Sequence, residues 1–179
     1  MIRLLAIAVF AAILAGCAGG GSQSASKEGE SKSSMISDVQ SARIEASTLS
    51  ARKLMFTKVE GSAVKGDTKA EYEAFYQGEV LRILEEELEY GERGESEKDY
   101  FFDGEGRLFY YTASDERAKQ AGKDKVRIRV AYDEGGNVIG SEKTVNGQPA
   151  TVSDAELKAV KARLGALRKT ADAARPAKK

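Results

Sequence analysis

The 179-residue sequence contains no histidine, no tryptophan and a single cysteine, Cys17. Ser-His-Asp and Cys-His catalysis and His- or Cys-ligated zinc, copper or haem sites need imidazoles or thiolates that the chain does not supply. An internal disulfide needs two cysteines and is excluded as well. An enzyme built from this chain would have to use carboxylates, Lys, Tyr or Ser. We therefore predict no catalytic residue, no cofactor and no metal site.

The chain also has no net charge, because 28 basic residues balance 28 acidic ones. Such a balance provides no global field for nucleic acid, which is not expected as a partner. The charges are nevertheless segregated. Thirteen acidic residues between Glu71 and Glu105 face three basic ones, and eight basic residues between Glu156 and Lys179 face two acidic ones. Solvated surface is the simpler interpretation of both blocks, and contact of the basic end with anionic lipid or a partner is the alternative.

The N-terminus has the pattern of a secretory leader, with Arg3 followed by an apolar run over residues 4–14. A membrane-spanning helix is the alternative, but the run is shorter than the ~20 residues needed to cross a bilayer. The sequence Leu14-Ala15-Gly16-Cys17 resembles the lipobox of bacterial lipoproteins. The resemblance implies that the signal peptide 1–16 is removed and that acylated Cys17 anchors the protein in the lipid bilayer. It also implies a cell-envelope location, with Ala18 favouring an outer-membrane anchor that faces the periplasm if the source is Gram-negative.

Residues 17–35 are interpreted as the lipidated cysteine and a flexible tether. From Ala18 to Ser34 the sequence reads AGGGSQSASKEGESKSS, with no residue larger than Ala that could enter a core. A tether of this composition has an r.m.s. span of roughly 20 to 25 Å. The segment 36–174 has the size of a single domain, with its core expected in 54–174, and residues 175–179 form a basic tail.

Two segments share the pattern aromatic, Asp, two variable residues, Gly, one variable residue, aliphatic: residues 102–108 and 132–138. A looser copy without the Asp occupies 75–80. Because strand-forming residues flank each copy, we expect repeated hairpins. Asp103 and Asp133 are expected to accept backbone hydrogen bonds in these turns, and Gly106 and Gly136 to supply a positive φ. A calcium loop is the alternative, but it needs carboxylates at alternate positions and a Glu at the twelfth.

The fold class predicted is α+β, an antiparallel β-meander of repeated hairpins packed by a C-terminal amphipathic helix. The segment around Phe101 and Tyr110 is apolar on both faces, so the middle hairpin is expected to be central and covered. Ser153 and Glu156 form a capping box at the start of the C-terminal helix. Its apolar stripe consists of Leu157, Val160, Leu164, Leu167 and Ala171.

A second helix is predicted at the start of the domain, over about 37–53, followed by a strand over 54–60. The helix has one apolar face, which consists of Val39, Ala42, Ala46 and Leu49. Its many Ser and Thr residues make this segment a weaker helix former than the C-terminal one.

The arrangement over 54–174 resembles a loose group of uncharacterised bacterial envelope lipoproteins, and this resemblance carries no catalytic residue. The function expected is a membrane-anchored envelope lipoprotein with a non-catalytic binding or scaffold role, with an envelope protein as a partner. The alternative is a carboxylate-dependent enzyme acting on envelope glycans, with two acids from 85–103. Convergence of two of those carboxylates in a pocket would separate the two functions.

Overall fold

The computed structural model of the protein describes residues 37–119 and 122–176. The predicted signal peptide, Cys17 and the whole of the tether lie outside these residues, as does the end of the basic tail. The described residues belong to one compact unit.

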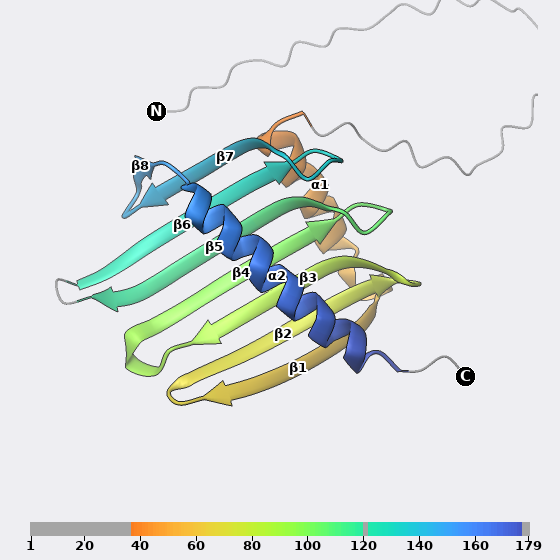
Figure 1. Ribbon diagram of the computed structural model, residues 1–179, viewed down its shortest axis with the longest axis horizontal. Helices are drawn as coiled ribbons and strands as arrows, with labels where there is room; N and C mark the ends of the chain where they lie inside the picture. The colour runs from red at the N-terminus through yellow and green to blue at the C-terminus, as the bar shows by residue number, and fades with distance from the viewer. Residues whose placement is uncertain (1–36, 120–121, 177–179) are drawn as a thin grey trace, which may run out of the picture. The chain divides into compact units, whose positions relative to one another are not determined.

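Eight antiparallel strands form one sheet, in which every strand pairs with its neighbours in sequence (Figure 1). This order confirms the predicted meander and the α+β class. The strands are β1 (Thr57–Lys65), β2 (Thr68–Gln77), β3 (Val80–Glu89), β4 (Gly94–Phe102), β5 (Leu108–Lys119), β6 (Gly122–Tyr132), β7 (Val138–Val145) and β8 (Gln148–Ala150). Short 3₁₀ turns occupy Lys53–Met55 and Gly91–Arg93.

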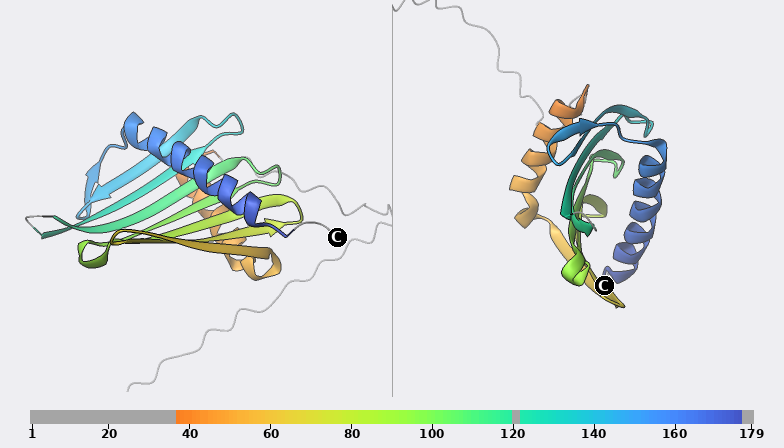
Figure 2. Two further views of the ribbon diagram at one scale, coloured as in Figure 1. Left: turned by 60° about the horizontal axis from the view of Figure 1, so that its bottom comes forward. Right: turned by 90° about the vertical axis from the view of Figure 1, so that its left-hand side faces the viewer.

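Two helices cover opposite faces of the sheet, α1 (Val39–Ala51) on one and α2 (Asp154–Ala174) on the other (Figure 2). Alternate side chains of each central strand therefore meet different helices. In β4, Tyr100 belongs to the core beneath α2 and its neighbour Phe101 to the core beneath α1. The middle hairpin is thus central and covered, as predicted, with α2 on one face and α1 on the other. The α1 side of the cover was not foreseen.

Both helices bury the faces that their sequences predict. The buried residues of α1 are Val39, Ala42, Ala46 and Leu49. In α2, Val160, Leu167 and Ala171 are buried, while Leu157 and Leu164 pack against the same core and are partly buried. The predicted capping box is formed, because Ser153 Oγ accepts from the backbone N of Glu156 at 3.4 Å, and Glu156 Oε2 accepts from the backbone N of Ser153 at 2.8 Å.

The turns at residues 103–107 and 133–137 have similar hydrogen bonds. Asp103 Oδ1 accepts from the backbone N of Arg107 at 2.9 Å, and Asp133 Oδ1 accepts from that of Asn137 at 2.8 Å. Burial opposes ionisation of Asp103, but hydrogen bonds from Arg107 and other turn amides leave its pKa below the ordinary value. Gly106 and Gly136 have φ values of 78° and 77°, which an L side chain rarely adopts. These aspartates therefore organise the backbone of their turns.

Two cations of α2, and Arg175 directly after its last residue, dock on the β2–β3, β4–β5 and β6–β7 turns. Three basic residues, each seven positions after the last, donate to the carbonyl oxygen of a turn glycine: Lys161 to Gly136 at 3.1 Å, Arg168 to Gly106 at 3.1 Å and Arg175 to Gly78 at 3.3 Å. Each cation also lies over the aromatic ring that enters its turn: Lys161 over Tyr132, Arg168 over Phe102 and Arg175 over Tyr76. Much of the basic character of this helix thus fastens it to the sheet.

Two details differ from the sequence-based expectations. The strand predicted from residue 54 begins at Thr57, because residues 53–55 form a 3₁₀ turn that leaves Leu54 and Met55 exposed. Arg175, assigned to the basic tail, has a side chain that is only 25% exposed and forms an ion pair of 2.9 Å with Glu79.

Candidate functional site: a groove between α2 and the sheet

α2 crosses its face of the sheet obliquely and leaves part of that face uncovered (Figures 1 and 2). Beside the helix lies an open groove of about 920 Å³. Side chains from β1 to β7 line it, together with residues from the first half of α2. Its apolar lining includes Ala70, Leu88, Ala113, Val126, Ile128 and Val145. The volume lies within the range of about 300–1,000 Å³ that is usual for small-molecule sites.

A buried carboxylate binds two of the cations that line this groove. Glu86 on β3 has a fully buried side chain, because it follows the alternation of Leu84 and Leu88 toward α2. Lys98 Nζ donates to Glu86 Oε2 at 3.2 Å, and Arg163 Nε donates to Glu86 Oε1 at 2.7 Å. A buried carboxylate needs such partners to offset its lost hydration. Two cations share one carboxylate, so this cluster carries a surplus positive charge.

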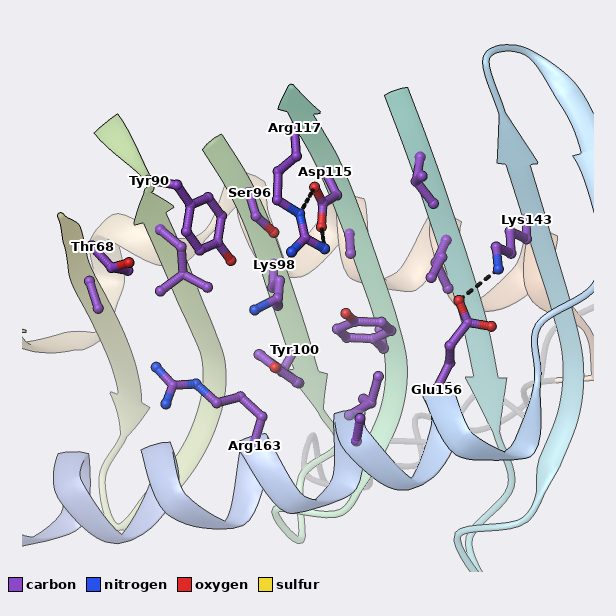
Figure 3. A pocket seen from close by; sticks show the side chains of 18 of the residues that line it. Thr68, Tyr90, Ser96, Lys98, Tyr100, Asp115, Arg117, Lys143, Glu156 and Arg163 are labelled. Carbon is purple, nitrogen blue, oxygen red and sulfur yellow. Dashed lines mark hydrogen bonds and ion pairs between the residues drawn. The ribbon is translucent and has the colours of Figure 1, made fainter. Parts of the chain in front are cut away.

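Two further ion pairs lie around the groove (Figure 3). Arg117 Nε donates to Asp115 Oδ1 at 2.6 Å, and the Arg117 guanidinium lies 5.4 Å from the centre of the Tyr90 ring. Lys143 Nζ donates to Glu156 Oε1 at 2.6 Å, joining β7 to the start of α2. Each of these pairs is neutral. With Lys65, the described groove residues and the underlying Glu86 have a surplus of two positive charges.

Two buried hydroxyl groups in the groove lining have no hydrogen-bond partner among the described residues. They are Ser96 Oγ and Tyr100 OH. Both residues lie on β4, on either side of Lys98 and on the same face. Leaving a buried hydroxyl unsatisfied costs roughly 1–3 kcal/mol. Burial raises the pKa of the Tyr100 hydroxyl well above its ordinary value, so the group keeps its proton and can donate.

The groove therefore combines apolar walls, two free hydroxyl donors and surplus positive charge. These are the properties of a binding site, since a few placed polar groups in an apolar pocket fix the orientation of a ligand. Nucleophilic catalysis would need a hydroxyl hydrogen-bonded to a base. Ser96 Oγ has no such partner in the described part of the chain.

The opposite face of the sheet carries an array of carboxylates. Strand register places Glu73, Glu85 and Asp99 in one row across β2, β3 and β4, and Glu71, Glu87 and Glu97 in the next. These six residues line a shallow pocket of about 510 Å³. Four acids of the 85–103 segment thus line one pocket on this face, Glu85, Glu87, Glu97 and Asp99, which is the convergence that the enzyme alternative requires. Like charges directly opposite each other on neighbouring strands destabilise a sheet.

Two carboxylates in this array have different environments. Lys53 Nζ lies 2.9 Å from both oxygens of Glu85 and compensates its charge. Burial, with the nearby charges of Glu85 and Glu97, raises the pKa of Asp99 to about 6. The folded protein thus holds a proton on Asp99 between pH 4 and 6, where the unfolded chain does not. Asp99 therefore makes the protein less stable as the pH rises through about 6.

The residues predicted from sequence do not form the groove. Cys17 lies outside the described residues, while Asp103, Gly106, Asp133 and Gly136 shape turns. Sequence reasoning missed Glu86, which it read as one member of an exposed acidic run. The period-two alternation of residues 84, 86 and 88 could have identified it.

Among the described residues, no group of three or more Asp, Glu, Cys or His side chains is placed to hold a metal ion.

The helices of the described residues were also examined as membrane spans, and neither α1 nor α2 has the length and apolar character that a span needs.

The chain was compared with known proteins in three ways. Protein-family models, curated proteins and solved structures were compared with the chain, and none of them matches it.

Proposed function

We propose that this protein is a lipid-anchored, non-catalytic binding protein of the cell envelope, and that it holds its ligand in the groove beside α2. The observation that carries the proposal is the pair of buried hydroxyls, Ser96 Oγ and Tyr100 OH, which have no hydrogen-bond partner among the described residues and lie in a groove that also has apolar walls. A bound ligand would supply the hydrogen bonds that these groups lack.

The anchor proposed is acylated Cys17, which would tether the domain to the lipid bilayer through residues 18–35. If the source is Gram-negative, the membrane is the outer one and the domain faces the periplasm. Replacing Cys17 with serine should abolish palmitate labelling and release the protein from the membrane fraction. Unchanged labelling of Cys17→Ser would contradict the anchor but would leave the groove proposal standing.

The groove is tested by native mass spectrometry of the protein extracted from its own envelope. We expect a co-purifying small molecule, which Ala113→Tyr should displace because this position lines the groove on β5. The matched control is Ser114→Tyr, the next residue of the strand, whose side chain points to the other face. Loss of the small molecule from both variants, or its absence from the wild type, would contradict the proposal. Proteins that co-purify would identify an envelope partner.

A second candidate function is a carboxylate-dependent enzyme acting on envelope glycans. Asp99 and Glu85 favour it. The pKa of Asp99 is raised, as in a general acid, and the charge of Glu85 is compensated by Lys53, as in a carboxylate that stays ionised. Glycoside hydrolysis uses two carboxyl groups in these two roles. Incubation of the protein with isolated envelope glycan tests this candidate. Release of reducing ends that Asp99→Asn abolishes would support it, and no release by the wild type would reject it.

We also propose that the hairpins are structural repeats of one unit. The like hydrogen bonds of Asp103 and Asp133 support this, as does the docking of one cation on each of three turns. Substituting DEGGN from 133–137 for DGEGR at 103–107 tests the idea. Equivalent turns should leave the free energy of unfolding within about 1 kcal/mol of the wild type, and a much larger loss would contradict equivalence.

A further inference from the structure

We propose that the groove beside α2 binds a single-chain amphipathic anion, an apolar chain that ends in a carboxylate or a phosphate. This inference rests on the proposed function, since it names the ligand class for the same groove. A free fatty acid and a single-chain phospholipid product share this chemistry, and the tests below distinguish them.

The position of the anionic head group follows from β4. Ser96, Lys98 and Tyr100 are alternate residues of this strand and line one row of the groove (Figure 3). The two hydroxyls lack partners within 37–119 and 122–176, and Lys98 shares the single carboxylate of Glu86 with Arg163. An incoming anion would accept hydrogen bonds from the hydroxyls and compensate the second cation. A cationic head group would add to a positive charge that is already in surplus.

The position of the apolar chain follows from the walls of the groove. The apolar walls on β5, β6 and β7 are formed by Ala113, Val126, Ile128 and Val145. The neighbouring charged residues pair with each other, Arg117 with Asp115 and Lys143 with Glu156. Small and aliphatic side chains leave room for a flexible methylene chain, which is held by burial of apolar surface and needs no directional contact. The groove is open to solvent and not an enclosed cavity, so a chain can enter it from outside.

The experiment uses the mature polypeptide from residue 17 with Cys17→Ser, so that no detergent is needed. N-phenyl-1-naphthylamine, a neutral fluorescent probe, reports occupation of the groove. Four twelve-carbon competitors differ only in their head groups: dodecanoate, dodecyl phosphate, dodecanol and dodecyltrimethylammonium, each used below its micelle concentration. We expect dodecanoate or dodecyl phosphate to displace the probe at least about tenfold more effectively than dodecanol, and the trimethylammonium to be the weakest.

Lys98→Met tests whether the head group lies where we place it. We expect this variant to lose most of the preference for the anion while dodecanol binds within twofold of its wild-type affinity. Lys158→Met, which removes the same charge from the exposed side of α2, should change neither. Circular dichroism of each variant checks the fold. The better of the two anions identifies a carboxylate or a phosphate as the natural head group.

The outcomes separate the two proposals. If dodecanol and the anions compete equally, or the trimethylammonium competes best, the groove is a binding site but the inference about charge is wrong. Retention of the anion preference in Lys98→Met would also overturn it. If neither the probe nor any competitor binds, both this inference and the groove as a binding site are wrong.

Discussion

Replacement of Glu86 by glutamine would remove the single negative charge between Lys98 and Arg163 and keep the shape of the side chain. The Lys98 side chain is 20% exposed and that of Arg163 is 42% exposed, so Arg163 can turn to water while Lys98 stays buried and unpaired. Breaking a buried ion pair by changing one partner costs about 3–5 kcal/mol. Because Arg163 can relax, we expect the lower end, about 3 kcal/mol, and a fall in Tm of roughly 6–12 °C.

Urea unfolding followed by circular dichroism measures this loss in the mature polypeptide. Glu87→Gln is the control, because the neighbouring carboxylate is exposed on the other face and should change stability by less than about 0.5 kcal/mol. A triple variant, Glu86→Leu with Lys98→Met and Arg163→Met, should recover most of the stability, since apolar residues can replace a buried ionic cluster. The reasoning is refuted if Glu86→Gln unfolds like the control.

Three further predictions concern the rest of the domain. Asp99→Asn should raise the free energy of unfolding at pH 7.5 by about 3 kcal/mol, because the pKa of Asp99 is raised from 3.8 to about 6. At pH 4 the folded protein already holds Asp99 protonated, so the substitution should change the free energy of unfolding little. Urea titrations at both pH values measure this, and equal effects would contradict it. Gly94→Ala should lower the free energy of unfolding by at least about 3 kcal/mol, because its Cβ would lie 1.9 Å from a backbone oxygen. Gly66→Ala, also at positive φ but with open space around it, should lower the free energy of unfolding by only about 1 kcal/mol. A chain that ends at Gln148 should aggregate or fail to melt cooperatively, while one that ends at Arg175 should melt like the full chain, because only the first loses the buried stripe of α2.

The elements that sequence reasoning predicted best are governed by local rules. The capping box of Ser153 and Glu156 and the apolar stripe after it act within a few residues of chain, so α2 begins at the expected position. The glycines at 106 and 136 likewise follow from the backbone conformation of a single turn. Periodicity also identified the buried face of α1, but nothing local indicates which face of a sheet a helix will cover.

The groove is formed by residues that are far apart in the sequence. Each of them lies in a segment whose local pattern has a simpler explanation, so the sequence did not single them out. Glu86 stands between two other glutamates, and only strand phase separates it from them. Arg163 looks like one of several basic residues on a helix, and its contact with Glu86 spans 77 positions. Ser96 became notable only because its hydroxyl is buried without a partner, which no composition or spacing reveals.

The three docked cations Lys161, Arg168 and Arg175 also relate the spacing of residues along the helix to the spacing of turns along the sheet. Turns at one end of a meander recur at every second strand, a distance of about 9.6 Å across the sheet. Seven helical residues rise about 10.5 Å, so a helix inclined by roughly 25° to the line of turns keeps pace with them. The 21 residues of α2 and the hairpins beneath it thus have matched pitches. A sheet lengthened by one hairpin would therefore need a helix longer by seven residues if a fourth cation is to dock on the added turn in the same way.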